Sequence, residues 1–379
     1  MSAMPAVRGV MPLSELPLPY PVYVGRDICS ALGDVVRGYA PAHRVVVIAD
    51  ATVASLHGDA LRSAFGGMRV DILSVPPGEA GKTRERWSQL TDDLLSLECG
   101  RDTTIVAVGG GVVGDLAGFV AATFMRGIPV VQVPTTLLSM VDASIGGKTG
   151  VDTPQGKNLV GAFHNPSAVL MDVSFLRTLP QAVFRSGFAE IIKHGVIADH
   201  TYLERVERLL PDVASLGSAA PDLPAVIAGS VRIKANVVAT DAREGGRRRI
   251  LNFGHTIAHA IERATDYRVS HGDAVAVGMV VECRIAEMMK VASAGLSARV
   301  ADVLYRAGLP ADLQALAKAT GATALAPEAL AILTRTDKKS ASGSVRYALP
   351  IRIGAMHEAD GQWALPVAEG MVLDALRRS

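Results

Sequence analysis

The segment Thr104-Ile-Val-Ala-Val108-Gly-Gly-Gly-Val-Val-Gly114-Asp115 decides the class of fold. Its first five residues are apolar or β-branched, as in a buried parallel strand, and a helical pattern begins after the glycines. Glycines at such a turn let the backbone approach a pyrophosphate, whose charge is favoured by the free N–H groups of the helix N-terminus. The match to G-x-G-x-x-G is weak by itself, because an ordinary strand-to-helix turn explains it equally well.

One feature of dinucleotide-binding folds is missing from this segment. An acidic residue about 20 positions further on usually binds the ribose, but no Asp or Glu lies between Asp115 and Asp142. If a dinucleotide binds, another acid must hold its ribose. The candidates are Asp50, which ends its own strand, and Glu79 in a loop, although ordinary loop chemistry also accounts for both.

Further strands and helices alternate with this segment. Short apolar runs occupy Arg44–Asp50, Arg69–Val75, Pro129–Val133 and Ala168–Met171, and helical periodicity occupies Lys82–Leu97 and Val113–Met125. Strands that alternate with helices indicate an α/β domain with a mainly parallel, Rossmann-like sheet. We predict that this N-terminal domain spans residues 1–180.

The pattern changes near Leu179-Pro180. Helical periodicity dominates from there, in the runs Leu223–Val238, His255–Ala264 and Asp273–Val291, and only Ser344–Ile353 is again typical of a strand. We therefore predict a second, mainly α-helical domain over residues 181–379.

Composition narrows the class of protein. The chain has 379 residues, 49% of them hydrophobic, and 38 Lys and Arg residues against 37 Asp and Glu give a net charge of +1, which excludes a disordered chain and argues against a nucleic-acid partner. Three widely spaced cysteines (Cys29, Cys99 and Cys283) form no disulfide framework and indicate a reducing, cytoplasmic location. No apolar run is long enough to span a bilayer, and the N-terminus is not a secretory signal.

Two glycine-flanked lysines follow the Pro134-Thr-Thr136 turn. They are Lys148, in Asp142-Ala-Ser-Ile-Gly-Gly-Lys148, and Lys157, which precedes Asn158. A lone loop lysine is usually solvated, but two within ten residues favour a cradle for a phosphate or carboxylate.

A histidine-rich stretch in the second domain indicates a metal site. Asn252, His255 and His259 share one face of a predicted helix, and His271 follows after a short loop. Two neutral imidazoles with a carboxylate form a set that leaves an open position on a zinc-type ion. Spacing alone leaves two pairs of histidines open, His255 with His259 or His255 with His271.

Other charged residues have ordinary explanations when taken alone. Glu190 and Lys193 lie three residues apart on one helix face, as in a surface ion pair, and Lys234 and the run Arg247-Arg-Arg249 add positive charge. Such runs, like Asp337-Lys338-Lys339 near the C-terminus, are usually solvated.

Taken together, these motifs resemble those of the 3-dehydroquinate synthase family, a member of the sugar phosphate cyclases. The resemblance is carried by GGGVVGDLAGFVAATFMRGIPVVQVPTTLLSMVDASIGGKTGVD, GKNLVGAFHNP, FAEIIKHG, LNFGHTIAHAIE and HGDAVAVGM, in this order, and is dense from Pro77 to Gly278. It implies a Rossmann-like NAD-binding domain, a helical metal- and substrate-binding domain, catalytic NAD and Zn²⁺ or Co²⁺. It also implies a homodimer with no nucleic-acid or membrane partner.

The resemblance also implies roles for individual residues. The metal ligands are Glu190, His255 and His271. The NAD-binding residues are Asp50, Glu79, Lys82, Gly110, Gly111, Val112, Val113, Gly114, Asp115, Thr135, Thr136, Lys148, Lys157, Phe175, Leu176, Arg177 and Thr178. The substrate and catalytic residues are Asp142, Lys148, Asn158, Lys193, Lys234, Arg248, Asn252, His259, Arg126 of the neighbouring subunit, and one of Lys338 or Lys339.

The implied reaction converts 3-deoxy-D-arabino-heptulosonate 7-phosphate to 3-dehydroquinate and phosphate in the shikimate pathway, which makes the enzyme a carbon–oxygen lyase acting on phosphates. A metal-bound alcohol is oxidised by NAD, phosphate is eliminated, NADH returns the hydride, and an aldol step closes the carbocycle. The substrate carries a phosphate and a carboxylate, which explains the many cations.

Rival interpretations differ in substrate or in reaction class. A cyclase for sedoheptulose 7-phosphate or glucose 6-phosphate would not need a carboxylate site, while the amino analogue of the synthase would keep almost the same residues. A metal- and NAD-dependent polyol dehydrogenase would release NADH, and a non-catalytic nucleotide-binding module would have no use for Glu190, His255 and His271 together.

Overall fold

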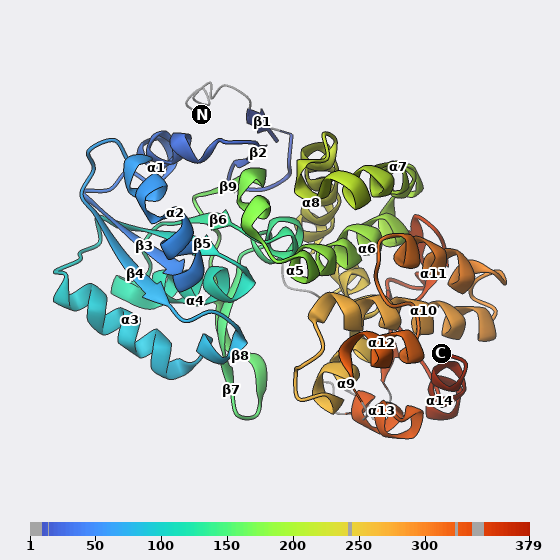
Figure 1. Cartoon of the computed structure of the whole chain (residues 1–379). Helices are drawn as coiled ribbons and strands as arrows, with labels where there is room; N and C mark the ends of the chain where they lie inside the picture. Colours follow the sequence, from blue (N-terminus) through green and yellow to red (C-terminus); the bar gives the residue numbers. More distant parts are fainter. Residues whose placement is uncertain (1–9, 14, 242–244, 323–324, 336–344) are drawn as a thin grey trace. The chain divides into compact units, whose positions relative to one another are not determined.

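A computed structural model of the chain describes residues 10–13, 15–241, 245–322, 325–335 and 345–379. The chain divides into two compact units, Met1–Leu179 and Pro180–Ser379. Figure 1 colours the first unit from blue to green and the second from green to red. The division lies next to residue 180, where the sequence predicts a boundary.

The N-terminal unit is built on a seven-stranded sheet with the order β1-β2-β9-β6-β5-β3-β4. The strands, in chain order, are β1 (Val10–Pro12), β2 (Val22–Gly25), β3 (Arg44–Asp50), β4 (Val70–Val75), β5 (Thr103–Gly109), β6 (Val130–Pro134) and β9 (Ala168–Asp172). All neighbouring pairs are parallel except β1 with β2. The predicted α/β class with a mainly parallel sheet is therefore confirmed.

Helices cover both faces of this sheet, and alternate side chains of each strand pack against them. Val45 and Val47 of β3 belong to the core under α1 (Leu32–Tyr39) and α2 (Ala51–Ser63). Val46 and Ile48 belong to the opposite core, under α3 (Arg84–Ser96) and α4 (Gly111–Thr123). Both faces are apolar, which is why the strands read as continuous β-branched runs in the sequence.

A two-stranded antiparallel hairpin, β7 (Lys148–Thr153) with β8 (Gly156–Phe163), was not predicted. Most of β8 is exposed, and its glycine- and lysine-containing sequence lacks the continuous β-branched run that marks the buried strands. Short helical turns complete the unit: η1 (Cys29–Ala31), η2 (Glu79–Gly81), η3 (Phe124–Arg126), η4 (Ser139–Ala143) and η5 (Val173–Thr178).

The C-terminal unit is mainly helical, as predicted. Its helices are α5 (Gln181–Ser186), α6 (Phe188–Ala198), α7 (His200–Leu216), α8 (Leu223–Thr240), α9 (His255–Ala264), α10 (His271–Met288), α11 (Leu296–Arg306), α12 (Leu313–Thr320), α13 (Pro327–Thr334) and α14 (Glu369–Arg377), with the short turns η6 (Gly217–Ala219) and η7 (Arg247–Asn252). The predicted run His255–Ala264 matches α9, whereas α10 begins and ends earlier than the predicted Asp273–Val291.

The predicted strand Ser344–Ile353 is wrong as a single element. The described part of this segment holds β10 (Arg346–Tyr347) and β11 (Pro350–Arg352), which pair with β13 (Leu365–Pro366) and β12 (Ala355–Met356) respectively. Pro350 has no N–H to donate, so it is found at the start of a strand rather than within one.

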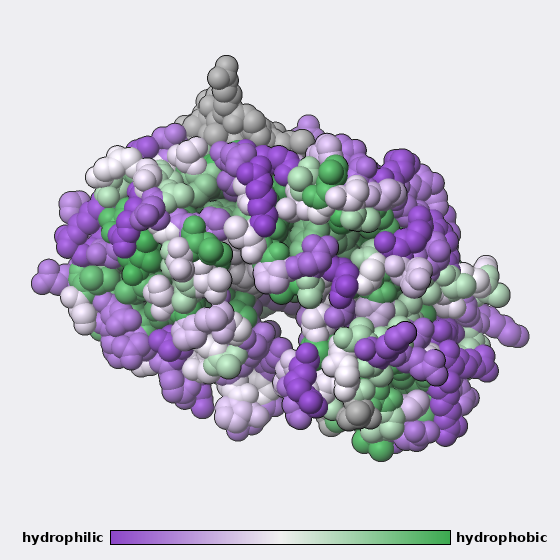
Figure 2. Space-filling view, viewed as in Figure 1, coloured by the Kyte–Doolittle hydropathy of each residue, from purple (hydrophilic) through white to green (hydrophobic). Residues whose placement is uncertain are grey.

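Helix α10 is the central, mostly buried helix of the C-terminal unit. It packs against α6, α9, α11 and α14, and most of its side chains are buried. On the face drawn in Figure 2, hydrophilic and apolar residues are interspersed over the surface of each unit. Among the described residues, no helix is both long and apolar enough to cross a membrane.

Candidate active site

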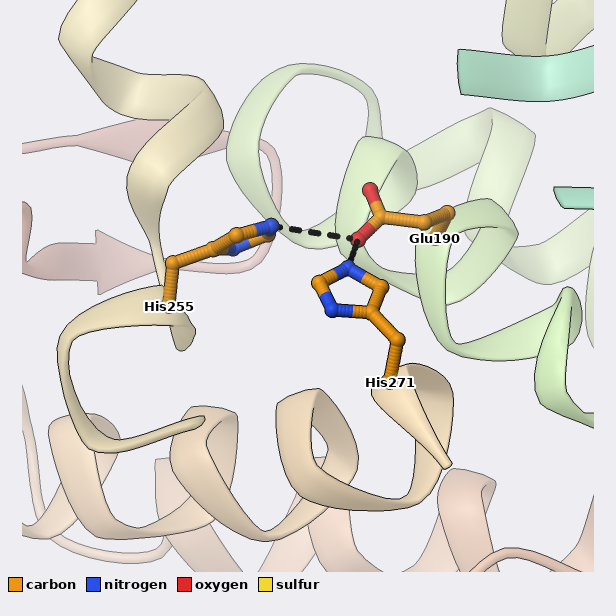
Figure 3. Close-up of side chains that lie close together, drawn as sticks. All are labelled: Glu190, His255 and His271. Carbon is orange, nitrogen blue, oxygen red and sulfur yellow. Dashed lines mark ion pairs between the residues drawn. The ribbon is translucent and has the colours of Figure 1, made fainter. Parts of the chain in front are cut away.

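Three side chains of the C-terminal unit form a group that could hold a metal ion. Glu190 lies in the first turn of α6, His255 is the first residue of α9, and His271 is the first residue of α10. One ligand atom from each lies within 4.8 Å of the other two. Figure 3 shows both imidazole rings directed at one carboxylate oxygen of Glu190.

The distances in this group fit a metal better than a hydrogen bond. Nε2 of His255 and Nε2 of His271 lie 3.6 and 3.7 Å from Oε1 of Glu190. Such separations are too long for hydrogen bonds, whereas two ligand atoms bound tetrahedrally to one zinc-type ion lie about 3.4 Å apart. Oε1 of Glu190 is buried without a hydrogen-bond partner among the described residues, whereas Oε2 contacts the ammonium group of Lys193. A divalent cation would satisfy Oε1.

The second ring nitrogen of each histidine is held by another group. Nδ1 of His255 lies 3.1 Å from the carbonyl oxygen of Phe253, and Nδ1 of His271 lies 3.1 Å from Oε1 of Glu262. With Nδ1 as the donor in both rings, Nε2 carries the lone pair that a metal needs. Contacts of this kind orient metal-bound histidines and raise their basicity.

Electrostatics favour a charged Glu190. Burial alone raises the pKa of this carboxyl group, but Lys193 and His271 outweigh it and hold the pKa well below its usual range. Burial, with Lys193, lowers the pKa of His255 far below the usual value. Burial also lowers the pKa of His271, yet Glu190 and Glu262 raise it to about 10. A metal ion would therefore displace a proton from His271, so binding should weaken as the pH falls.

Of the two histidine pairs that spacing leaves open, His255 and His271 lie together in the group with Glu190. The ring of His259 lies 5.8 Å from that of His255, on the next turn of α9, and His259 is not part of the ligand group. The start of α10 is fixed by Ser270, whose hydroxyl accepts the N–H of Asp273 at 3.2 Å. The side chains of His255 and His271 are 13% and 29% exposed against none for Glu190, so an open coordination position would lie on the histidine side.

Predicted substrate residues of this unit lie on elements that pack together. Helix α6 packs against α8 and η7, and α8 packs against η7. Lys193 of α6 is buried, contacts Oε2 of Glu190 and donates to the carbonyl of Leu251 at 2.8 Å. Lys234 of α8 and Arg248 of η7 are also buried, while Asn252 and His259 are half-buried. Lys338 and Lys339 lie outside the described residues.

A second polar cluster lies in the N-terminal unit. The ammonium group of Lys82 is buried and lies 2.6 Å from both Oδ2 of Asp115 and Oδ1 of Asn158. Burial lowers the pKa of Lys82, but Asp115 more than compensates and raises it. Nζ of Lys157 lies 3.5 Å from Oε2 of Glu79. Four predicted cofactor residues are thus brought together with Asn158, a predicted substrate residue.

The glycine segment that opens α4 presents backbone groups. Gly110 is the N-cap of α4. Because glycine has no side chain, this residue does not cap the first N–H groups of the helix. A Cβ atom on Gly114 would lie 2.9 Å from Oε1 of Gln132. The N–H of Thr135 donates to the carbonyl of Gly109 at 2.9 Å, which places the Thr135–Thr136 turn beside this segment.

The other predicted cofactor residues also follow the carboxyl ends of parallel strands. Asp50 ends β3, and its Oδ1 accepts the N–H of Thr52 at 2.8 Å as the cap of α2. The segment Phe175–Thr178 lies in η5 after β9, where Phe175 and Leu176 are buried. Thr178 contacts His57, and Arg177 pairs with Asp27 at 3.3 Å.

Asp142, Lys148 and Arg126 lie on further elements of this unit. Asp142 is half-buried in η4, and Lys148 is exposed at the start of β7. Arg126 is exposed in the turn after α4, with a positive φ of 66°.

Several residues of these sites were missed from the sequence. Glu262 holds His271, and Asp241 accepts the N–H of Arg248 at 3.0 Å. Asp152 accepts the N–H of Asn158 at 2.8 Å. Glu262 ends the quoted motif HTIAHAIE, and its position seven residues after His255, on the same helix face, could have singled it out. Asp241 and Asp152 carry no such signal.

Comparisons with known proteins show the family of the chain. Family models described as 3-dehydroquinate synthase N-terminal and 3-dehydroquinate synthase C-terminal match residues 72–186 and 187–340. A 3-dehydroquinate synthase from Symbiobacterium thermophilum is 46% identical over 95% of this chain and 98% of its own length.

Solved structures extend the likeness to the fold. A 2-deoxy-scyllo-inosose synthase, complexed with carbaglucose-6-phosphate, NAD⁺ and Co²⁺, matches with a TM-score of 0.86 and 25% identity over 97% of this chain and 99% of that one. A 2-epi-5-epi-valiolone synthase from Streptomyces hygroscopicus, with NAD⁺ and Zn²⁺ bound, matches with a TM-score of 0.82 and 27% identity over 95% and 96%. The chain belongs to the 3-dehydroquinate synthase family.

Proposed function

We propose that this protein is a 3-dehydroquinate synthase of the shikimate pathway. It would convert 3-deoxy-D-arabino-heptulosonate 7-phosphate to 3-dehydroquinate and phosphate, as a carbon–oxygen lyase acting on phosphates. Family models that together cover residues 72–340 support this proposal, as does a relative of that name at 46% identity. The observation that carries it in the structure is the group of the buried Glu190 with the half-buried His255 and His271.

The cofactors of the proposed reaction are a divalent metal and NAD. Glu190, His255 and His271 would hold Zn²⁺ or Co²⁺, the ions bound in the two related structures. Such an ion lowers the pKa of a bound hydroxyl group, and NAD supplies a hydride acceptor that is regenerated within the cycle. NAD would be bound by the predicted residues after the parallel strands, with its pyrophosphate at the N-terminus of α4.

Lys193 has a defined position for its proposed role. Its ammonium group is held between the Glu190 carboxylate and the Leu251 carbonyl, and it is almost fully buried. A fixed cation in such surroundings interacts strongly with developing negative charge and needs no reorganisation. We assign Lys193 to orienting a substrate hydroxyl group and stabilising its oxygen as the proton leaves.

The remaining cations would bind the two anionic groups of the substrate. We assign Lys148, Asn158, Asn252 and His259 to the phosphate, and Lys234 and Arg248 to the carboxylate, with Asp142 orienting hydroxyl groups. Guanidinium groups suit carboxylates because they donate two parallel hydrogen bonds. The backbone N–H of Arg248 donates to Asp241, and this contact holds Arg248 in place. One of Lys338 or Lys339 completes the set.

Oligomeric state and location are further parts of the proposal. Arg126 is exposed on a turn in which Met125, Arg126 and Gly127 all have positive φ, so the backbone holds this side chain in an uncommon conformation. We propose that it contributes to the neighbouring subunit's site in a homodimer, which light scattering would test. The three free cysteines agree with a reducing cytoplasm.

The reaction is tested by following two products at once. The purified protein, loaded with metal and NAD, should release phosphate from the heptulosonate phosphate over many turnovers while absorbance at the NADH band stays flat. An equal accumulation of NADH would instead support a polyol dehydrogenase and overturn the proposal.

Substrate choice within the cyclases is tested separately. Replacing Arg248→Ala should lower kcat/KM for the carboxylate-bearing substrate far more than for a carboxylate-free sugar phosphate. An equal loss for both would contradict the assignment of Arg248 to the carboxylate. Activity on the amino analogue, compared with the parent substrate, would decide between these two close alternatives.

A further inference from the structure

The two helices that carry the ligand histidines each supply a buried glutamate to the start of the other helix. Glu262 of α9 contacts the imidazole of His271, the first residue of α10. In the opposite direction, Glu282 of α10 accepts the N–H of Gly254 through Oε2 at 2.8 Å. Gly254 is the N-cap of α9 and immediately precedes His255. The two contacts therefore form a reciprocal pair.

Glu282 replaces a cap that α9 lacks in its own sequence. In a capping box, a Glu or Gln at the third helical position accepts the N–H of the N-cap residue. The third helical residue of α9 is Ile257, and no side chain of the N-cap residue caps this helix. The fully buried Glu282 provides the same acceptor from a different helix. Its carboxyl group also lies at the N-terminal end of α9, where the helix dipole favours an acidic side chain.

The start of α9 has little freedom to adjust if this contact is lost or changed. A Cβ atom on Gly254 would lie 2.8 Å from Cγ of Met279, and one on Gly278 would lie 2.0 Å from the carbonyl oxygen of Gly254. Gly254 itself has a φ of +80°, which a glycine adopts without strain. Gly254, the N-cap residue of α9, therefore rests against the backbone of α10, and Glu282 fixes the point of contact.

We propose that Glu282 is a positioning residue of the metal site. By holding the N–H of Gly254, it fixes the start of α9 so that Nε2 of His255 faces Oε1 of Glu190. The inference rests on the proposed metal site at Glu190, His255 and His271. Outer contacts that orient metal-bound histidines usually contribute 10- to 100-fold to metal affinity, and Glu282 acts one residue further back, through the backbone.

The test measures metal affinity in the full-length protein without substrate. Zn²⁺ affinity would be measured by competition with a chromophoric chelator, and the visible spectrum of the Co²⁺ form would report ligand geometry. Glu282→Met fills the same volume without a comparable acceptor and should weaken Zn²⁺ binding on the order of tenfold or more. Glu282→Gln keeps an acceptor oxygen and should remain within a few-fold of wild type. Glu282→Asp keeps the acid but is one methylene shorter, so it should bind more weakly than Glu282→Gln.

A matched control is available on the same helix. Glu287 accepts the N–H of Ser297 at 2.8 Å and its hydroxyl at 2.9 Å, and so caps α11, which carries no proposed ligand. Glu287→Met should lower the thermal midpoint of the metal-free protein yet leave Zn²⁺ affinity and the Co²⁺ spectrum unchanged.

The outcomes separate the inference from the function it rests on. Wild-type affinity in Glu282→Met, an equal loss in Glu287→Met, or weaker binding by Glu282→Gln than by Glu282→Asp would overturn the positioning role. If Glu282→Met does not fold, the order of Gln and Asp decides. Absence of Zn²⁺ binding by the wild-type protein would instead refute the proposed metal site itself.

Discussion

The two proposed ligand sites differ in which part of the chain contacts the ligand. In the C-terminal unit, the proposed metal ligands are side chains that other side chains and one carbonyl hold in place. In the N-terminal unit, the proposed pyrophosphate site is the backbone of a glycine segment at the start of α4. At a site of the first kind, removal of one functional group should weaken ligand binding. At a site of the second kind, addition of one atom should weaken it.

The largest effect should come from removing one ligand. Glu190→Gln keeps the shape of the side chain but takes away its charge, and Zn²⁺ affinity should fall by more than about 100-fold, beyond the loss of an outer contact. The nearly fully buried Lys193 would also lose its carboxylate partner, so the unfolding free energy of the metal-free protein should fall by about 3 kcal/mol. Metal content reports the loss of Zn²⁺ binding, and urea denaturation measures the unfolding free energy. Unchanged metal content would refute this site.

A smaller effect should follow from an outer contact of the same site. Glu262→Gln weakens the acceptor that holds Nδ1 of His271, and Zn²⁺ affinity should fall by about 10- to 100-fold while NAD binding is unchanged. Chelator competition measures the Zn²⁺ affinity, and protein fluorescence followed during a titration with NAD measures the NAD affinity. Equal losses of metal and NAD would show a general defect of the fold instead.

The backbone site is tested by adding one carbon atom. Gly110 has a φ of −72°, which alanine adopts without strain, and a Cβ there would lie 3.3 Å from Cγ2 of Thr136. Gly110→Ala should therefore fold normally and retain its metal, but weaken NAD binding on the order of tenfold, about 1.4 kcal/mol. Calorimetric titration with NAD measures it. Wild-type NAD affinity would contradict a pyrophosphate position at this turn.

The smallest effect is expected outside both sites. Hydrogen bonding to Arg299 outweighs burial and, with Arg306, lowers the pKa of Glu207 from 4.5. A lowered folded-state pKa stabilises the protein above the unfolded value and ceases to do so as the pH falls through the folded value. Glu207→Gln should therefore be less stable than wild type at pH 7, and the difference should shrink below pH 4.5. Thermal melts across this range, with unchanged metal and NAD affinities, would complete the comparison.

The elements that could be predicted are those whose burial requires a recognisable run of apolar residues in the sequence. The strands β3, β5 and β6 are buried on both faces and read as β-branched runs. The β7–β8 hairpin is largely exposed on β8 and has no such pattern. Pro350 divides a segment that composition alone presents as one strand.

The metal site was only partly predictable for a related reason. His255 and His259 share a helix face, so spacing cannot rank that pair below His255 with His271, which meet only because α9 packs against α10. The prediction of His255 with His271 came from the resemblance to a known family. Glu282 belongs to no local pattern, because its partner Gly254 lies 28 residues away and the contact exists only in the packed helices.

The central claim, that side chains of one unit form a complete metal site, has a direct test. Anomalous X-ray diffraction from crystals grown with Zn²⁺ would locate the ion. We expect one peak about 2.1 Å from Nε2 of His255, Nε2 of His271 and a carboxylate oxygen of Glu190. A peak bound by His259 in place of His271, or a fully loaded ion at another position, would contradict it.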